Sequence, residues 1–182
     1  MAYDNGGIMW DGPPDPERGI YYPIRSCKPG HDVRGVVLCE VVYGVVTHWE
    51  PDENVKGGGR TVPCMGKACW CRTAKPKPED RWKGYVSMWD HSSGRLFLAE
   101  ITRESYLRCG SFELYKGQLR GKYLKLVRAG EKKNSRVNAV VSVWQQPLAN
   151  IPPSFNVQSA LERIWFGRWG GPGTSEGAKV DV

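Results

Sequence analysis

The sequence lacks any apolar run close to the ~20 residues that a membrane-spanning helix needs. Met1 leads into polar residues without the basic and then apolar pattern of a signal peptide. We therefore expect a soluble, cytoplasmic protein that makes no membrane contact. In a reducing cytoplasm the six cysteines are expected to stay reduced or to bind metal, and not to pair as disulfides.

Histidine is also scarce, with only His31, His48 and His91 in the chain. No cluster of carboxylates, no Gly-rich phosphate loop and no Ser/His/Asp arrangement stands out. An enzyme needs such a constellation of reactive groups around one site. The sequence therefore favours a binding protein over an enzyme.

One histidine and three cysteines gather between residues 48 and 71, in a segment otherwise rich in Gly, Lys and Arg. Cys64, Cys69 and Cys71 form a close cluster, His48 supplies a remote fourth ligand, and the glycines at 57–59 let the chain fold back. Four such ligands are typical of a closed, structural zinc site, because a catalytic zinc keeps one position open. The spacing C-x4-C-x-C differs from the common C-x-x-C pair, so free thiols and a disulfide stay as alternatives.

The positive charge is confined to two segments. Residues 56–83 hold eight Lys and Arg against two acidic residues, giving +6, and residues 116–136 hold eight against one, giving +7. The whole chain carries +7, so the remainder is acidic. This segregation favours a polyanionic partner, with two solvated loops as the alternative.

The apolar pattern predicts a mainly β fold. Residues 34–49 are rich in β-branched residues and are typical of one long strand that bends at Gly35 and Gly44. Residues 82–89 and 96–101 predict one hairpin, 102–118 a short helical connection starting at Thr102, and 122–128 with 136–144 a second hairpin. This order indicates a five-stranded OB-like Greek-key barrel with the zinc-binding loop between strands 1 and 2. An SH3-like barrel and an irregular sandwich are the alternatives.

Segments of different composition flank the predicted barrel, which spans residues 34–149. Residues 1–33 are dense in Gly, Pro and Asp and indicate an extended N-terminal arm, whereas 171–182 predict a disordered tail. Residues 150–170 predict a short C-terminal helix with one apolar face. This helix either packs on its own barrel or presents Trp165, Phe166 and Trp169 to a protein partner or a second copy.

In an OB barrel, the loop after strand 1 and the loop between strands 4 and 5 flank an oligonucleotide-binding face, and here both loops are basic. Single strands are held by cations at the phosphates and by aromatic rings at the bases. On strand 82–89 we expect Tyr85 and its neighbours on one face to contact nucleic acid, while Val86 and Met88 enter the core. The predicted contact residues are Arg60, Lys67, Trp70, Arg72, Arg81, Lys83, Tyr85, Trp89, Lys125, Lys132, Lys133 and Arg136.

A loop that interrupts an OB-type barrel with His48, Cys64, Cys69 and Cys71, in that order, resembles the zinc-containing single-stranded DNA-binding proteins of T-even phages. The resemblance covers residues 34 to about 144 as architecture and those four ligands as motif. It implies salt-sensitive binding of single-stranded DNA without sequence preference, in replication or recombination of a phage or mobile element. The chain departs from that family in its C-x-C pair, its short length and its lack of an acidic tail. The alternative is an assembly subunit of a larger nucleoprotein complex that contacts RNA or duplex through its basic loops.

Overall fold

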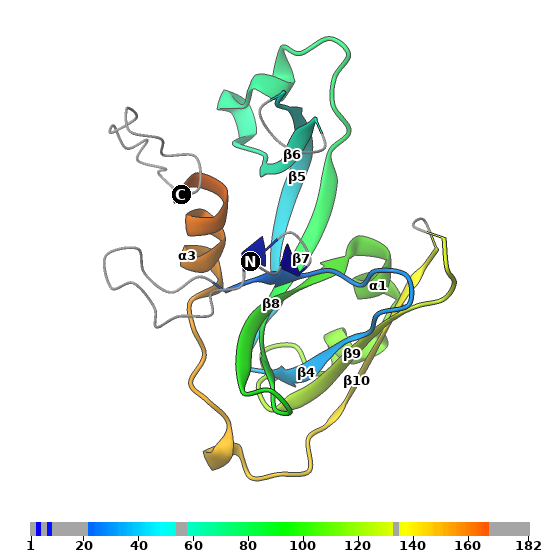
Figure 1. Ribbon diagram of the computed structural model, residues 1–182, viewed down its shortest axis with the longest axis vertical. Helices are drawn as coiled ribbons and strands as arrows, with labels where there is room; N and C mark the ends of the chain where they lie inside the picture. The colour runs from blue at the N-terminus through cyan, green and yellow to red at the C-terminus, as the bar shows by residue number, and fades with distance from the viewer. Residues whose placement is uncertain (1–2, 5–6, 9–21, 54–57, 133–134, 168–182) are drawn as a thin grey trace.

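A computed structural model describes residues 3–4, 7–8, 22–53, 58–132 and 135–167, and these residues are mainly β (Figure 1). Eight strands form one mixed sheet in which β10, β9, β4, β7, β5 and β6 follow each other, while β8 pairs with β7 and β3 with β8. Two short strands, β1 (Tyr3–Asp4) and β2 (Gly7–Ile8), pair separately. The bounds in the large sheet are β3 (Ile24–Arg25), β4 (Val33–Val37), β5 (Tyr43–Pro51), β6 (Gly59–Pro63), β7 (Arg81–Asp90), β8 (Arg95–Thr102), β9 (Lys122–Arg128) and β10 (Val137–Val143).

The predicted first strand is divided into β4 and β5, and both halves pair antiparallel with β7. The break lies at residues 38–42, where the Leu38 amide still donates to the Ser87 carbonyl at 2.8 Å. It does not lie at Gly35 or Gly44, as the sequence had suggested. A Cβ at Gly35 would lie 2.6 Å from the Trp89 carbonyl oxygen, so this glycine permits a close approach of strands. The division lets β4 pair with β9 while β5 pairs with β6.

Short helices connect the strands. The predicted helical connection is confirmed as α1 (Arg103–Arg108) and α2 (Gly110–Leu114), and the Thr102 hydroxyl accepts a hydrogen bond from the Ser105 amide at 3.1 Å. One-turn helices η1 (Gly66–Ala68), η2 (Trp70–Arg72) and η3 (Leu148–Asn150) lie in the loops. The chain then forms α3 (Val157–Glu162) and a further turn, η4 (Arg163–Gly167). Within the described residues, every helix is too short or too polar to cross a membrane.

Both faces of β7 are buried. Val86 and Met88 lie in the largest core cluster, together with side chains of β4, β8 and β9, as the alternation predicted. On the opposite face, Tyr85 and Leu98 pack beneath the apolar side of α3, which includes Leu161. The C-terminal helix therefore docks on its own sheet (Figure 1).

The expectation that Tyr85 faces nucleic acid was wrong, since only 1% of its surface is exposed. Burial and the neighbouring Glu100 raise the pKa of its hydroxyl. The alternation within residues 82–89 distinguishes the two faces of the strand, but it contains no information about a helix some seventy residues later in the sequence that covers one of them.

The sheet is open. The ladders from β4 to β7, β4 to β9 and β9 to β10 follow the predicted strand order. Among the described residues, however, no ladder joins β10 to β8, which the closed barrel of the prediction required. At this position α1 lies against β10, where the Ser105 hydroxyl donates to the Val137 carbonyl at 2.7 Å. The mainly β prediction is confirmed, and the closure is not part of the observed pairing.

Candidate metal centre and adjoining groove

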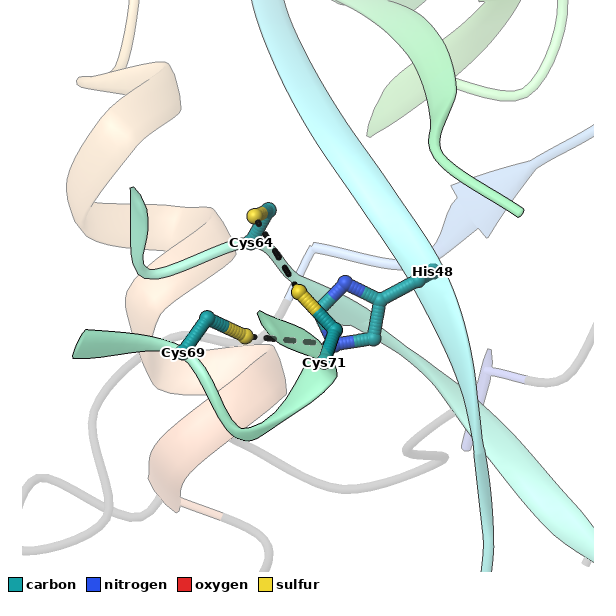
Figure 2. Close-up of side chains that lie close together, drawn as sticks. All are labelled: His48, Cys64, Cys69 and Cys71. Atoms are coloured by element: carbon teal, nitrogen blue, oxygen red, sulfur yellow. Dashed lines mark hydrogen bonds between the residues drawn. The ribbon is translucent and has the colours of Figure 1, made fainter. Parts of the chain in front are cut away.

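The four predicted metal ligands lie together at the end of the β5–β6 hairpin (Figure 2). His48 is on β5, Cys64 follows β6, and Cys69 and Cys71 come from the loop that contains η1 and η2. Their ligand atoms all lie within 4.8 Å of one another. His48, Cys69 and Cys71 are buried and Cys64 is half-buried. The group can hold a metal ion, and all six cysteines of the chain have free thiols.

Two of the six distances between ligand atoms in the cluster match the edges of a zinc tetrahedron. With Zn–S of about 2.3 Å and Zn–N of about 2.0 Å, two sulfurs lie about 3.8 Å apart and a sulfur and a nitrogen about 3.5 Å apart. The Sγ atoms of Cys64 and Cys71 are 3.9 Å apart, and Cys69 Sγ is 3.5 Å from His48 Nε2. Four buried or half-buried ligands in this arrangement can hold a metal ion such as zinc.

Backbone hydrogen bonds hold the cysteines in place. In the hairpin, His48 lies opposite Val62, and the Cys64 amide donates to the Val46 carbonyl at 2.7 Å. Gly66 then turns the chain with a φ of +64°, a region that favours glycine. Its carbonyl accepts from the Cys69 amide at 3.3 Å and from Arg72 Nε at 3.2 Å. The local sequence therefore returns the last two cysteines toward β5.

The electrostatics of the cluster favour a bound cation. Burial, followed by the adjacent thiols of Cys69 and Cys64, raises the pKa of Cys71 to about 11. For Cys69, burial acts in the same direction, but hydrogen bonds from the backbone of Cys71 and Met65 outweigh it and lower the pKa. Among the described residues, the buried Nδ1 of His48 has no hydrogen-bond partner. A cation at the cluster would bind Nε2, the other ring nitrogen, and would stabilise the thiolates beside it.

A groove of about 680 Å³ adjoins the metal cluster. It lies between β5 and the segment 74–79, and His48 forms part of its wall. Two half-exposed tryptophans line it, Trp49 at 50% and Trp70 at 39% exposure. Lys75 and Lys77 also line it; both are exposed, and neither forms an ion pair with any described residue. The groove thus combines aromatic faces with positive charge.

The hairpin holds Trp49, and the segment 64–72, which we call the metal loop, holds Trp70. A Cβ added at Gly59 would lie 2.7 Å from Cε2 and Nε1 of Trp49, so the indole rests directly on the backbone of β6. Trp70 meets the His48 ring edge-on, with 5.2 Å between ring centroids. Each tryptophan is next in sequence to a predicted metal ligand.

The structure separates the predicted nucleic-acid contacts into groups. Trp70, Arg81 and Lys83 line the groove. Arg81 pairs with Glu79 at 2.7 Å and Lys83 pairs with Glu100 at 2.8 Å. The other predicted contacts lie outside the groove lining. Arg60 donates a hydrogen bond to Glu50, and Lys67 and Arg72 are exposed in the metal loop. Trp89 packs with the core cluster of Val36, Leu38 and Ile151, and Tyr85 is buried.

The second basic segment lies elsewhere. The β9–β10 turn, which Lys132 and Arg136 flank, lies to the right of the sheet in Figure 1, whereas the metal loop is at the top. Lys125 on β9 pairs with Asp32 at 3.0 Å, and Lys133 is outside the described residues. The two basic segments therefore lie at different places around the sheet (Figure 1).

The predicted aromatic patch near the C-terminus is described only at Trp165. This side chain is half-buried and meets the Tyr85 ring edge-on at 5.8 Å. The side chain of Phe166 and the whole of Trp169 lie outside the described residues.

Trp49, Lys75 and Lys77 were not among the predicted contacts. The signal for Trp49 was its place directly after His48, because a strand that turns one side chain to the metal turns the next one away. The signal for the two lysines was the K-P-K-P run at 75–78, which contributes to the net charge of the first basic segment.

No protein-family model, curated protein or solved structure matches the chain.

Proposed function

We propose that this protein is a zinc-stabilised single-stranded DNA-binding protein without sequence preference, which acts in replication or recombination of a phage or mobile element. The observation that carries the proposal is the groove beside the metal cluster, lined by half-exposed Trp49 and Trp70 and by the exposed Lys75 and Lys77. Zinc has a structural role in this proposal, and no reaction is catalysed.

The aromatic lining favours an unpaired strand. A base in a duplex is stacked on both sides, whereas a base in a single strand can stack on a tryptophan, at about 1–3 kcal/mol per base. Every base has such a face, so this binding tolerates any sequence. Lys75 and Lys77 have no acidic partner among the described residues, and such lysines suit phosphate oxygens, since no described ion pair must break first.

The order of the strands supports the same proposal. If β4 and β5 count as one bent strand, the elements follow the order of an OB barrel, with α1 and α2 between the third and fourth strands. The metal loop then occupies the loop after strand 1, as in the T-even phage proteins that the ligand order resembles. We propose an OB-like barrel that α1 interrupts at the position where β10 would otherwise pair with β8.

Two measurements on the full chain test the proposal. Elemental analysis of protein purified without a histidine tag should give about one zinc per chain. Anisotropy of a labelled oligo-dT should rise on titration with the protein, and the affinity should fall with salt by a slope of about −0.7 per phosphate contacted. A labelled DNA duplex of equal length is the matched control and should bind more weakly. Absence of oligo-dT binding, or equal affinity for the duplex, would contradict the proposal.

A further inference from the structure

The two tryptophans that line the groove belong to different parts of the metal cluster. Trp49 follows His48 on β5, and Trp70 lies between Cys69 and Cys71 in the metal loop. Any ion bound by the cluster therefore joins the segment that holds one tryptophan to the segment that holds the other.

Trp49 is fixed without the metal. It lies on β5, which pairs with both β6 and β7, and its indole rests on the Gly59 backbone. β7 in turn belongs to the main core. This wall of the groove should keep its position when the metal leaves.

Trp70 depends on the metal loop. Its carbonyl accepts local hydrogen bonds from Thr73 and Ala74, and among the described residues its ring meets one other aromatic ring, that of His48. None of the described core clusters contains a residue from 64–72. The loop has no apolar core of its own to fix this second wall.

We infer that the bound metal holds Trp70 in the lining of the groove that Trp49 also lines, so that metal at the cluster and single-stranded nucleic acid in the groove bind cooperatively. The inference rests on the proposed function and adds its regulation: withdrawal of the metal lowers affinity for the strand while the sheet stays folded. By thermodynamic reciprocity, the strand must raise the affinity for the metal by the same factor.

The coupling is geometric and not electrostatic. A divalent ion with three thiolates and a neutral imidazole carries a net charge of about −1. Such a centre repels phosphate weakly and cannot attract it. If the metal strengthens binding, it does so by holding Trp70.

Anisotropy titrations with labelled oligo-dT test this, with the full chain either metal-loaded or treated with a zinc chelator. The variants are Trp49→Ala and Trp70→Ala, with Trp49→Phe and Trp70→Phe as conservative partners that keep a stacking ring. Met65→Ala is the matched control, because Met65 is exposed in the same loop but does not line the groove. Circular dichroism follows the fold in each case.

In the metal-loaded state each alanine variant should bind roughly tenfold more weakly, the phenylalanine variants should retain most of the affinity, and the control should match the unchanged chain. Chelation should weaken the unchanged chain and Trp49→Ala by a similar factor. It should have little effect on Trp70→Ala, which has already lost the ring that the metal positions. Oligo-dT should also slow zinc loss to the chelator in the unchanged chain but not in Trp70→Ala.

The outcomes separate the two proposals. If the unchanged chain fails to bind oligo-dT, the proposed function fails and the coupling fails with it. If it binds equally with and without metal, or if chelation affects Trp70→Ala as strongly as the unchanged chain, the coupling is wrong and the function stands. Undiminished affinity of both alanine variants would place the strand outside this groove.

Discussion

Removal of the metal should unfold the metal loop without unfolding the sheet. The loop between Cys64 and Arg72 contributes no residue to the described core clusters, and it lies at the end of the β5–β6 hairpin in Figure 1. Its order comes from a few backbone hydrogen bonds and from the four ligands. The body of the protein has its own core around Val86 and Met88.

The free energy by which the metal should stabilise the loop follows from the number of residues that the metal closes into a ring. A link between residues 48 and 71 closes a loop of ~24 residues, which the chain-entropy relation for cross-links values at about 3.4 kcal/mol. The hairpin already pairs His48 with Val62, and the remaining ~10 residues give about 2.7 kcal/mol by the same relation. We therefore expect about 3 kcal/mol, or roughly a hundredfold increase in the open population when the metal is withdrawn.

Hydrogen exchange followed by mass spectrometry measures this opening segment by segment. The amides of Cys69 and Arg72 are hydrogen-bonded within the loop, and their exchange should accelerate roughly a hundredfold on chelation. Amides of β9 are the internal control and should not change. Cys69→Ser should reproduce the effect without chelator and should lose the metal, whereas Cys109→Ser, outside the cluster, should keep it.

Two results would refute this reasoning. Unchanged exchange in the loop after complete metal removal would mean that the backbone hydrogen bonds suffice to order it. Equal acceleration in the loop and in β9 would mean that the metal stabilises the whole sheet, which the separation of the core from the cluster does not allow.

Three further changes test the fold. Leu161→Ala removes a fully buried side chain from the apolar side of α3 and should lower the free energy of unfolding, measured in urea, by about 2–5 kcal/mol. Leu114→Ala, at a position with 74% exposure, should change it by less than about 0.5 kcal/mol. Thr102→Ala removes the N-cap of α1 and should lower the free energy of unfolding by about 1 kcal/mol, whereas Thr102→Ser, which keeps the capping hydroxyl, should retain most of that stability. For Asp90, burial raises the carboxyl pKa, but hydrogen bonds from Ser92 and Ser93 outweigh it and lower the pKa from 3.8 to about 2. The stabilisation by the ionised carboxylate is present above about pH 4 and is lost as the pH falls through about 2. Asp90→Ala should therefore lower the free energy of unfolding by about 2 kcal/mol at pH 7 and by little at pH 2. An equal decrease at both pH values would contradict the assignment.

Local patterns in the sequence were sufficient for much of the sheet. The alternation over 82–89 predicted β7 within a residue at each end, and the second hairpin was likewise placed closely, because period-two burial is encoded in neighbouring residues. The break at 38–42 was not predicted, because valines lie on both sides of Leu38, Cys39 and Glu40 and keep the whole segment rich in β-branched residues. That break depends on β7 accepting two partner strands in succession, which is a tertiary constraint.

The ligands of the candidate metal centre could be selected from the sequence, and the surface beside them could not. Cysteines in a Gly- and Lys-rich loop have few roles in packing, so their residue types indicated a metal. The place of Trp49 in the groove could not be predicted from residue type, because it depends on the pairing of β5 with β6 and on the absence of a side chain at Gly59. Tyr85 was misassigned for a related reason, since α3 covers it from far along the chain.

Under the proposed function, the position of α3 restricts where a single strand could bind. In an OB barrel the open face of strands 2 and 3 is the usual place for an oligonucleotide, but here Tyr85 and Leu98 on that face are sealed by the apolar side of α3. A strand that used this face would have to displace the helix and expose those side chains, at roughly 1.5–3 kcal/mol for each large one. The groove beside the metal cluster requires no such displacement, because Trp49 and Trp70 are already half-exposed. Stacking at the groove is therefore favoured over binding to the sheet, and the metal loop is the part of this fold that we expect to contact the strand.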